Sequence, residues 1–519
     1  MIFRTGAGEP LRGWTHDLSR SGCFIATETG VPAGEVDVLV IGAGMAGLSV
    51  AYELLRAGRG VLVVDKSPIG AGETGRSSAH VASALDDHFY LIERMHGERG
   101  AKLAAESHTE AIKSILQTAT RERFACGARH VEGYLYAERG SQHERRILDQ
   151  EYQAARRAGL DVRWADRTSL PFDTEGALCF AGQAEIDPMA YLRGLATAVE
   201  RLGGVICTGF HVESVSSATK PIVHIRDHAP LAAQAVVVAT NTPINDVVTI
   251  HSKQAAYRSY VLALEIPRGT VQPALYWDLK DPYHYIRLVG DDLLLVGGED
   301  HKVGQSRSPE QSWERLLTWT RERFPSVGDV RSGWSGQIFE PADGMAFIGK
   351  NPGPSKNVFI ATGDSGNGIT HGAIAGLLLT DLILGRNNPW AELYDPSRKP
   401  VDATSLRTFM KENLNVAAQY RDWVAPSDRA REGRGEGYVE RRGMHRVAVY
   451  VGENGARHAC SARCPHLGAA VRWNSAEGSW DCPAHGSRFD PRGHVVTGPA
   501  KQDLPPLETS AAVEERPGE

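Results

Sequence analysis

Three glycines between a short apolar run and a helical pattern constrain this fold more than any other feature of the sequence. Residues 37–41 read Asp-Val-Leu-Val-Ile, and Gly42-Ala-Gly44-Met-Ala-Gly47 follows, before leucines and alanines at helical spacing. Gly42 permits a tight turn, Gly44 lets the backbone approach a pyrophosphate, and Gly47 lets the helix pack closely on the strand. The pattern predicts a strand, a glycine turn and a helix whose first amides face an anion.

An acidic residue stands where such a turn needs one. The second apolar run, Val61–Val64, ends at Asp65, which is placed to accept a hydrogen bond from a ribose hydroxyl. Glycine clusters often form turns without any ligand, but here the strand, the helix and the acid are in register. We therefore predict a nucleotide-binding β-α-β unit, and this fingerprint alone does not distinguish NAD from FAD.

Length and charge limit the remaining possibilities. A chain of 519 residues exceeds what one core usually organises, so two or three domains are expected. The formal net charge of −6 gives no surplus for binding polyanions, which argues against a nucleic-acid partner. No apolar stretch reaches about 18 residues, and residues 1–13 lack a signal-peptide pattern, so we expect a cytoplasmic protein without a transmembrane segment. Four cysteines without paired spacing are expected to be reduced and buried: Cys23, Cys126, Cys179 and Cys207.

Helical and strand patterns alternate through the first half of the chain. Helices are expected over about residues 88–125, 143–158 and 191–202, with strands at 203–215 and 235–240. The block 251–335 is strand-rich and predicts an antiparallel cap. Beyond Trp390 the chain turns polar, and a helix around Leu406–Val424 is expected before a charged linker at Asp428–Arg442.

Four further segments carry a family resemblance. They are Gly70-Ala-Gly-Glu-Thr-Gly-Arg-Ser-Ser78, Glu185-Ile-Asp-Pro188, Asp343-Gly-Met-Ala-Phe-Ile-Gly349, and Ala361-Thr-Gly-Asp-Ser-Gly-Asn-Gly-Ile-Thr370, which precedes a helix expected over Ala373–Leu384. Over residues 36–390 the chain resembles the D-amino-acid-oxidase-like (glycine-oxidase-like) FAD-dependent oxidoreductases, although Ala346 replaces a proline of that family's signature. The resemblance implies FAD as the nucleotide. The turn Gly363–Gly368 could instead only cap the following helix.

The fingerprint and the resemblance together assign a set of FAD contacts. These are Gly42, Gly44, Met45, Ala46, Gly47, Asp65, Lys66, Thr74, Arg76, Ser77, Ser78, Gly363, Asp364, Gly366, Gly368 and Ile369.

Two loops near the C-terminus each contain one cysteine and one histidine. They are Cys464-Pro-His466 and Cys482-Pro-Ala-His485, with fifteen residues between them. Two thiolates can hold one iron while two neutral imidazoles hold another, which is the Rieske arrangement of a [2Fe–2S] cluster. A tetrahedral zinc site is the alternative, but zinc fingers with this ligand set keep both cysteines in one pair. The sequence therefore predicts a cluster held by Cys464, His466, Cys482 and His485.

Residues around the two loops resemble the Rieske family, through His466-Leu-Gly468, Trp480-Asp-Cys482, Gly486-Ser-Arg-Phe-Asp490 and Gly498-Pro499-Ala500. Ala469 and Ala484 stand where the respiratory branch has a bridging cysteine pair, and Phe489 stands where it has a tyrosine. With Ser487 as the remaining hydrogen-bond donor, the resemblance implies a potential in the lower part of the range of about −150 to +300 mV. Cys460 lies off the ligand pattern and is expected to be a free thiol.

Candidates for a substrate site come from the predicted cap. Tyr283, Tyr285 and Arg287 alternate on one strand, so they share a face, and Arg287 could pair with a substrate carboxylate. The alternative is an ordinary polar sheet face. His371 follows the second flavin turn and is predicted to orient the flavin or act as a base, or else to be bonded to the backbone at the helix start. Two residues show the strand pattern more weakly: Tyr257 and Arg258.

The predicted fold is an α/β Rossmann-type FAD-binding domain with an antiparallel β-rich cap, plus a small all-β Rieske domain. We expect a leader at 1–35, an oxidoreductase module at 36–390, a helical linker at 391–428 and the Rieske domain at 429–519. Within the module, FAD-binding parts are expected at 36–110, 185–250 and 336–390, and cap parts at 111–184 and 251–335.

A flavin takes a hydride from an organic substrate, whereas an iron–sulfur cluster passes single electrons. The leading hypothesis is an oxidoreductase that oxidises a small amine or amino-acid-like substrate and passes electrons through the cluster to a one-electron carrier protein or a quinone. In a second hypothesis the Rieske domain accepts electrons and the flavin relays them. In a third the chain is a redox-sensing docking protein.

Overall fold

The computed structural model describes residues 35–216, 219–245, 250–306, 308–355, 357–399, 403–424, 432–443 and 445–507. The predicted leader lies almost wholly outside the described residues, and so does part of the predicted linker. The chain divides into two compact units, here called the large unit and the small unit. The described residues of the large unit are 35–301 and 311–412, and those of the small unit are 302–310 and 413–507.

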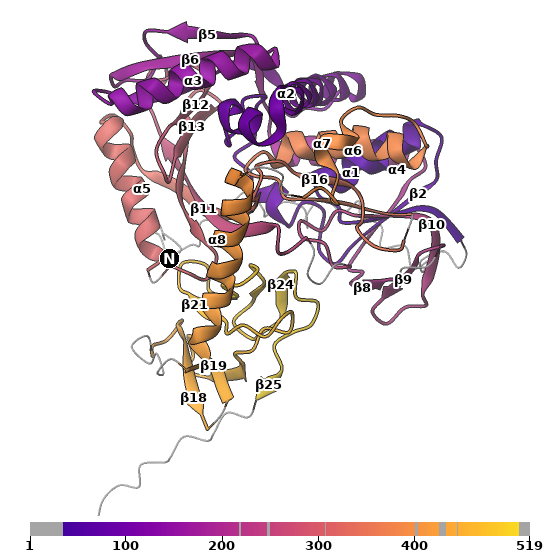
Figure 1. The fold of residues 1–519 in the computed structure, drawn as a ribbon. Coiled ribbons are helices and arrows are strands. Elements are labelled where there is room, and N and C mark those ends of the chain that lie inside the picture. Colours follow the sequence, from indigo (N-terminus) through magenta and orange to yellow (C-terminus); the bar gives the residue numbers. More distant parts are fainter. Residues whose placement is uncertain are drawn as a thin grey trace, which may run out of the picture. The chain divides into compact units, whose positions relative to one another are not determined.

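A mainly parallel sheet forms the nucleotide-binding half of the large unit. Its strands run in the order β16 (Phe347–Lys350), β17 (Val358–Thr362), β10 (Leu231–Val238), β1 (Glu35–Ile41), β2 (Val61–Asp65) and β7 (Val205–Thr208), and the pair β8 (Val212–Val215) and β9 (Ile222–Ile225) extends β10. β1 lies parallel to both β2 and β10, with Val38 opposite Val61. Such central strands are buried on both faces, which explains their continuous apolar runs. Figure 1 shows α1 (Met45–Arg56), α4 (Pro188–Arg201) and α6 (Gly368–Ile383) on one side of this sheet.

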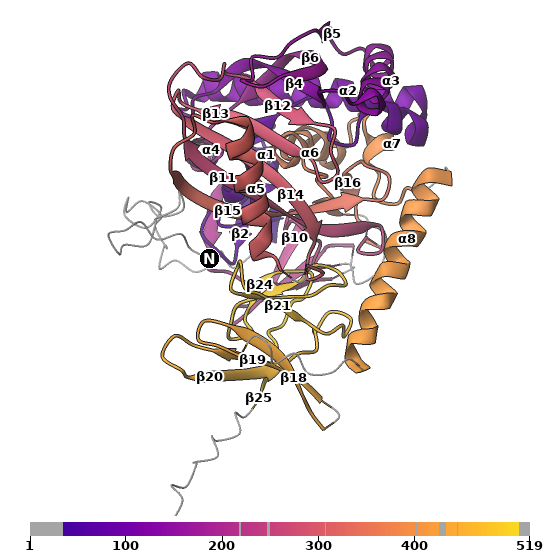
Figure 2. The same ribbon diagram turned by 90° about the vertical axis from the view of Figure 1, so that its left-hand side faces the viewer.

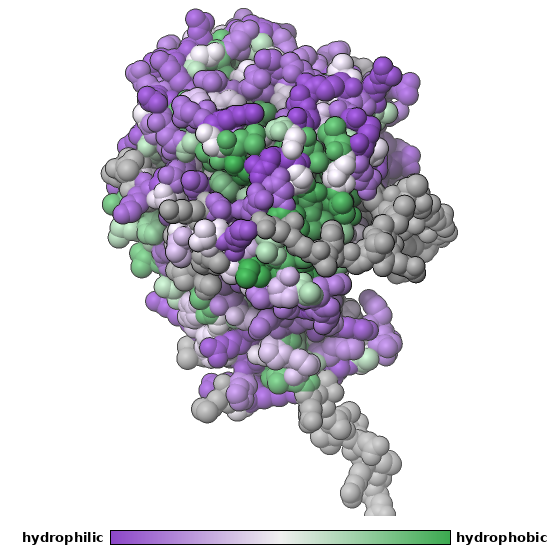
Figure 3. Space-filling model, turned by 90° about the vertical axis from the view of Figure 1, so that its right-hand side faces the viewer, coloured by the Kyte–Doolittle hydropathy of each residue, from purple (hydrophilic) through white to green (hydrophobic). Residues whose placement is uncertain are grey.

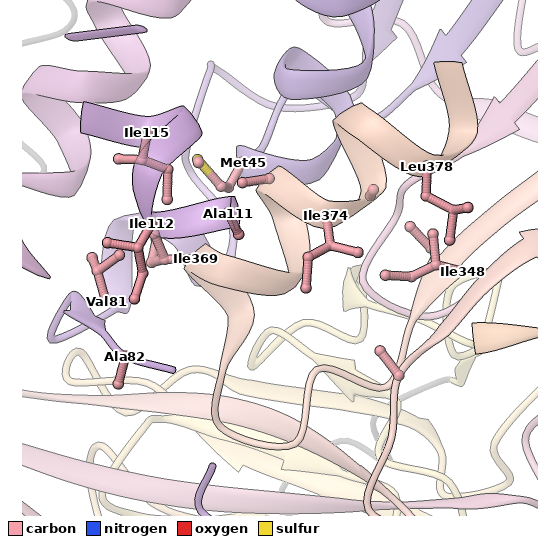
Figure 4. Close-up of a cluster of buried hydrophobic side chains, with 14 of the residues drawn as sticks. Met45, Val81, Ala82, Ala111, Ile112, Ile115, Ile348, Ile369, Ile374 and Leu378 are labelled. Carbon is pink, nitrogen blue, oxygen red and sulfur yellow. The ribbon is translucent and has the colours of Figure 1, made fainter. Parts of the chain in front are cut away.

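Helix α6 begins at Gly368, five residues before the predicted start. Its glycines let it approach α1 closely, because a Cβ at Gly372 would lie 2.6 Å from Cγ of Met45, and one at Gly376 would lie 2.9 Å from Cβ of Ser49. Figure 4 shows the core at this place, where α6 meets Met45 and the apolar face of α2 (Phe89–Glu122). Ten labelled members of the cluster are Met45, Val81, Ala82, Ala111, Ile112, Ile115, Ile348, Ile369, Ile374 and Leu378.

A nine-stranded sheet forms the cap of the large unit. Its order is β15 (Val330–Pro341), β11 (Gln254–Glu265), β14 (Leu293–Lys302), β13 (His284–Val289), β12 (Leu275–Asp278), β4 (Arg129–Glu138), β6 (Thr174–Glu185) and β3 (His80–Val81), with β5 (Val162–Ala165) on β6. The predicted antiparallel pairing holds except between β4 and β12, which are parallel. Parallel neighbours need a long crossover, and here residues 139–274 provide it.

Helices flank the cap sheet, as Figure 2 shows for α2, α3 (Gln142–Ala158) and α5 (Glu310–Arg323). Glu151 of α3 accepts hydrogen bonds from the amides of Phe89 and Tyr90 at 2.9 and 3.1 Å, and so supplies the cap that the start of α2 lacks. Two short elements complete the large unit: η1 (Glu73–Arg76) and α7 (Ala391–Tyr394).

The Asp343–Gly349 signature is fixed by an arginine that follows α7. Arg398 forms two bonds to the carboxylate of Asp343, at 2.7 and 2.8 Å, and donates to the carbonyl of Ala346 at 2.7 Å. Its guanidinium lies 4.0 Å from the ring centroid of Phe347. Burial alone would raise the pKa of Asp343, but Arg398 holds it below its usual value. The substituted signature therefore keeps its shape through an ion pair from outside the motif.

Replacing Arg398 with methionine is expected to lower the free energy of unfolding by about 3 kcal/mol, because it leaves the buried carboxylate of Asp343 uncompensated. Urea unfolding followed by flavin fluorescence measures the loss. As the matched control, Arg386→Met removes a looser pair, 3.6 Å from Asp381 and 60% exposed, and should cost below about 0.5 kcal/mol. Equal losses in the two variants would contradict the role given to Arg398.

Two four-stranded sheets build the small unit. One has the order β18 (Gly437–Arg442), β19 (His445–Val451), β20 (Arg457–Ser461) and β25 (Pro506–Leu507), and the other β21 (Arg472–Asn474), β22 (Ser479–Asp481), β23 (Arg488–Phe489) and β24 (Val495–Thr497). Trp480 and Phe489 are fully buried between them. The helix predicted at 406–424 is α8 (Ala403–Gln419) followed by the 3-10 turn η2 (Tyr420–Val424).

The small unit also includes residues 302–310, which run from the end of β14 to the first residue of α5. Arg472 donates to the carbonyl of Gly304 at 2.9 Å, and Gln305 donates to the carbonyl of Pro483 at 3.0 Å. Ser475 donates to Glu310 at 2.8 Å. This short segment is thus held by side chains and backbone of the C-terminal sheets.

Surface and cysteines complete the description. Figure 3 shows hydrophilic residues over the upper part of one face, with hydrophobic residues gathered below them in the large unit. Within the described ranges, no helix is long and apolar enough to cross a membrane.

Cys126 and Cys179 are free and buried as predicted, whereas Cys207 is only half-buried because β7 is an edge strand. Cys23 lies outside the described residues.

Candidate functional site

The glycine turn after β1 has no room for side chains at two positions. A Cβ at Gly42 would lie 2.2 Å from the carbonyl oxygen of Ala239, and one at Gly47 would lie 1.8 Å from that of Gly42. Gly42 also has a φ of +111°, which favours glycine. Gly44 precedes α1 without any side-chain cap, so the helix start presents amides to a ligand.

The acid at the end of β2 lies at this turn. Asp65 accepts hydrogen bonds from the amides of Ala43 at 2.7 Å and Ser67 at 2.8 Å. Burial raises its pKa. Thr74 accepts a hydrogen bond from the amide of Met45 at 3.0 Å, which joins the predicted segment 70–78 to the glycine turn. The structure therefore brings together two segments that the sequence separates by more than twenty residues.

The predicted second flavin turn leads into α6. Gly363 and Gly366 have φ of +73° and +77°, and a Cβ at Gly366 would lie only 2.0 Å from Oδ2 of Asp86. Asp364 accepts from the amide of Phe339 at 3.3 Å, and burial raises its pKa to about 7. The helix N-cap, Asn367, makes no side-chain cap bond. The cradle expected for FAD therefore has tight glycine turns at two helix starts, and these residues fit a bound dinucleotide.

Two tyrosines of the cap lie against this second turn. Tyr283 donates to Asp86 at 3.1 Å, and the hydroxyl of Tyr285 lies 3.1 Å from that of Ser259. The two rings are 5.7 Å apart, and His80 meets Tyr285 edge-on at 5.3 Å. Burial raises the pKa of both tyrosines, so their phenols stay protonated at neutral pH.

Arg287 has partners within the protein. Its guanidinium donates to the carbonyls of Ser78 and Ile186 and lies 3.4 Å from a carboxylate oxygen of Glu185. The carboxylate beside it is therefore the protein's own. The pairing with a substrate carboxylate stays a prediction that none of these contacts supports.

His371 takes the alternative role that the sequence left open. Its Nδ1 donates to the carbonyl of Asp364 at 2.9 Å, and its Nε2 lies 3.2 Å from Nε2 of His108. The side chain is buried, and burial lowers its pKa to about 4. A neutral imidazole with both nitrogens engaged serves the helix start, and the contact with flavin is not supported by this position.

Sequence reasoning missed a set of acids around the tyrosines: Asp86, Asp87, Asp300 and Glu340. Burial raises the pKa of Asp86 to about 6 and those of Asp87 and Asp300 to about 7, while that of Glu340 rises well above its usual value. One signal could have indicated them. The pair Asp86-Asp87 follows the buried strand β3 and a largely apolar stretch, only eight residues after the predicted flavin segment.

The two Cys/His loops of the small unit close in the same way. In the first, the amide of Cys464 bonds to the carbonyl of Ala469 at 2.9 Å, and that of Gly468 to Cys464 at 2.9 Å. The second repeats this pattern at equivalent positions, with the amide of Cys482 bonded to Ser487 at 2.8 Å and that of Gly486 to Cys482 at 3.0 Å. The two loops therefore share this pattern of backbone hydrogen bonds, and each presents one cysteine and one histidine.

The four predicted ligands converge. Both cysteines are 1% exposed, and the hydrogen bond between them lowers the pKa of Cys464 and raises that of Cys482. The rings of His466 and His485 lie 5.0 Å apart at 87°. Two adjacent thiols and two adjacent imidazoles fit a two-iron cluster, in which the thiolates hold one iron and the imidazoles the other. When bound, the cluster supplies one-electron transfer.

Cys460 is separate from this set. It is buried in β20 as a free thiol, as predicted, and burial raises its pKa to about 12.

Ser487 lies beside the first ligand, as the sequence led us to expect. Its side chain is fully buried, lowers the pKa of Cys464 by hydrogen bonding, and accepts from the amide of Ala500 at 3.0 Å. The hydroxyl proton is therefore available to the sulfur.

Replacing Ser487 with alanine is expected to lower the cluster's midpoint potential by about 60 mV, the one-electron equivalent of a hydrogen bond worth about 1.4 kcal/mol. A redox titration followed by EPR measures the shift. Ser461→Ala, at a serine that bonds to the amide of Arg463, is the control and should leave the potential unchanged. An unchanged potential in Ser487→Ala would show that the hydroxyl does not act on the cluster.

A dinucleotide cradle under a polar cap, together with two Cys/His loops, defines a flavin-dependent oxidoreductase with an iron–sulfur domain. The chain belongs to the FAD dependent oxidoreductase family, whose model matches residues 37–382, and a Rieske [2Fe-2S] domain matches residues 423–508. It binds FAD and a [2Fe–2S] cluster, as predicted.

Individual relatives match most of the chain or about two thirds of it. The chain is 27% identical to the putative Rieske 2Fe-2S iron-sulfur protein YhfW of Bacillus subtilis, over 91% of this chain and 93% of that one. It is 25% identical to gamma-glutamylputrescine oxidoreductase of Escherichia coli, over 67% and 84% of the two chains. Glycine oxidase from Geobacillus kaustophilus has the same fold, with a TM-score of 0.59 and 18% identity over 70% of this chain and 99% of that one.

Proposed function

We propose that the large unit oxidises a small amine or amino-acid-like substrate and that electrons leave through the Rieske cluster. In this reaction the C–H bond next to nitrogen breaks, its hydrogen leaves with two electrons, and the nitrogen lone pair forms the C=N bond of an imine. Water then hydrolyses the imine. The flavin supplies the hydride acceptor, and the cluster supplies transfer of single electrons to a carrier protein or a quinone.

The observation that carries the proposal is the polar face opposite the second flavin turn. Tyr283, which precedes β13, lies at the turn Gly363–Gly368, because its hydroxyl would be 3.5 Å from a Cβ on Gly366, and it donates to Asp86, which approaches Gly366 as well. Polar groups that converge over the expected flavin face favour a bound substrate, whereas a relay has no use for them. The relatives named for glycine and for gamma-glutamylputrescine add support from the family.

Within this proposal the tyrosines bind and orient. Their phenols are protonated, so each can donate one hydrogen bond or accept one, and the neighbouring hydroxyl of Ser259 fixes the rotamer of Tyr285.

The test is anaerobic addition of amines and amino acids to the purified protein, followed by absorbance and low-temperature EPR. Flavin bleaching followed by a reduced Rieske signal is the expected result. If no compound bleaches the flavin but a one-electron carrier reduces the cluster and then the flavin, the chain is a relay and the proposal is wrong. If neither reduction occurs, the redox-sensing docking role replaces it.

A further inference from the structure

Four carboxylates meet between the second flavin turn and the cap, and we call them the acidic cluster: Asp86, Asp87, Asp300 and Glu340. They come from the loop after β3, the end of β14 and the end of β15. Asp86 raises the pKa of each of the other three, and Asp87 and Asp300 also raise that of Glu340, so the four lie within electrostatic reach of one another. Four acids from three elements are therefore held in one buried region.

Among the residues that the structure describes, no lysine or arginine pairs with these four acids. Asp86 accepts from Tyr283 and Asp87 from Ser365, which are both neutral hydroxyls. Asp343, which raises the pKa of Asp87, is itself paired with Arg398. His284 lowers the pKa of Asp300, but its Nδ1 forms a hydrogen bond with Asp278 at 3.0 Å. Among the described residues, the partners of the cluster thus supply hydrogen bonds and no dedicated positive charge.

Asp300 points independently to a ligand. Both of its carboxylate oxygens are shielded from solvent and have no hydrogen-bond partner among the described residues. The hydroxyl of Ser259 lowers the pKa of Asp300 but lies outside hydrogen-bond geometry with both of its oxygens. A buried carboxylate without partners is costly, by about 1–3 kcal/mol or more. Its two oxygens are available to a cationic donor.

The cluster lies where the substrate of the proposed function would lie. Asp86 fills the space above Gly366, in the turn expected to contact the flavin, and Asp87 bonds to the adjacent Ser365. Electrostatics there oppose a carboxylate on the substrate, because Asp86, whose pKa of about 6 leaves it mostly ionised at neutral pH, lies at this turn. The oxidised nitrogen cannot itself be the counter-charge, because it must be a neutral amine when its lone pair forms the C=N bond.

We propose that the substrate is an aliphatic diamine or polyamine, whose neutral amine is oxidised at the adjacent carbon while a second, ammonium group is held by Asp300 and the rest of the acidic cluster. This inference rests on the proposed function and specifies its substrate. The oxidation removes a hydride from carbon and a proton from nitrogen and leaves an imine, and water converts the imine to an aldehyde and ammonia, or to an aldehyde and an amine where the oxidised nitrogen is secondary. The ammonium that binds the cluster takes no part in bond breaking.

The test compares compounds that share the oxidisable end and differ at the other end. The FAD- and cluster-loaded protein is mixed anaerobically with diamines of three to six carbons, the corresponding monoamines, the corresponding ω-amino acids, and the triamine spermidine. Flavin bleaching gives the rate at each concentration, and thermal unfolding of the holoprotein gives binding without turnover. We expect at least 100-fold higher bleaching efficiency for one diamine or spermidine than for its monoamine, and none for its amino acid.

Asp300→Asn tests the named contact. The variant keeps the side-chain volume but removes one charge, and the ratio of diamine to monoamine efficiency should fall at least tenfold. Asp292→Asn is the matched control, because Asp292 lies in the same hairpin and pairs with Arg268 at the surface, 60% exposed. Its ratio should equal that of the unchanged protein.

The outcomes separate the inference from the proposed function. Bleaching by amino acids at equal or higher efficiency overturns the cation assignment while leaving an amine or amino-acid oxidoreductase. A diamine that raises the unfolding temperature without bleaching the flavin supports the cation site and overturns the proposed reaction. If no diamine or triamine binds or bleaches, or if Asp300→Asn leaves the ratio unchanged, the inference is wrong.

Discussion

A protein in which Cys482 is replaced with alanine is expected to lose its iron–sulfur cluster and keep its FAD. The thiol of Cys482 is 1% exposed and lies beside that of Cys464, and one iron depends on these two sulfurs alone for its protein ligands. Iron should fall from two atoms per chain to near zero, and the EPR signal should vanish. Flavin reduction by substrate should continue, but reduction of a one-electron acceptor should fall at least about 100-fold.

The matched control for this loss is Cys460→Ala. Cys460 is as buried as the ligand and lies four residues before Cys464, but its sulfur is 3.9 Å from the carbonyl of Ala448 and away from both loops. Iron content and EPR signal should match those of the unchanged protein. Loss of the cluster in both variants would mean that general destabilisation of the small unit, and not ligation, explains the result.

Replacing Gly44 with valine is expected to weaken FAD binding at least 100-fold, or about 2.7 kcal/mol, without unfolding the apoprotein. Gly44 has a φ of −89° that any residue can adopt, and the nearest atom to an added Cβ is Oγ1 of Thr74 at 3.1 Å. The protein therefore tolerates the side chain, but the side chain occupies the approach of the pyrophosphate. Equilibrium titration of the apoprotein with FAD measures the affinity.

Gly60→Ala provides the comparison. Gly60 precedes β2, and its added Cβ would meet Cβ of Asp37 at an ordinary 3.6 Å. FAD affinity and the unfolding temperature should stay as they are in the unchanged protein. Normal FAD affinity in Gly44→Val would show that the pyrophosphate does not pass this turn.

The parts of the site that could be predicted are encoded in contiguous residues. The turn Gly42–Gly47 and the loops around Cys464 and Cys482 each combine the needed backbone conformation and functional groups within a few positions. A short motif of this kind constrains its own structure, since sterics and local hydrogen bonds decide it. For the same reason the sequence could place Ser487 beside the cluster, because Ser487 follows the second loop closely along the chain.

The rest of the site depends on which distant segments meet. Arg287 was interpreted from the alternation of its strand, but Glu185, about a hundred residues earlier, is the carboxylate that it pairs with. Asp86 and Asp300 have ordinary local sequences, and their burial arises only when the cap lies on the second flavin turn. Strand periodicity predicts which face of the sheet a side chain lies on, but it does not predict which residues of distant segments pack against that face.

The boundary of α6 shows a smaller effect of the same kind. Three glycines between 366 and 372 argue for a turn by propensity, but the helix already begins at Gly368, and Gly372 within it packs closely against Met45 of α1. Tertiary packing therefore overrides a local preference of about 1 kcal/mol per glycine.

The segment 302–310 affects how this protein can be divided into modules. Because Gly304 and Gln305 are bonded to Arg472 and Pro483, the small unit is assembled from two stretches of chain that lie more than a hundred residues apart. A gene fragment that starts in the linker would encode both sheets but would lack the segment 302–310 that is bonded to them. A graft of this Rieske unit onto another enzyme would therefore need an inserted loop in the host as well as a fused tail.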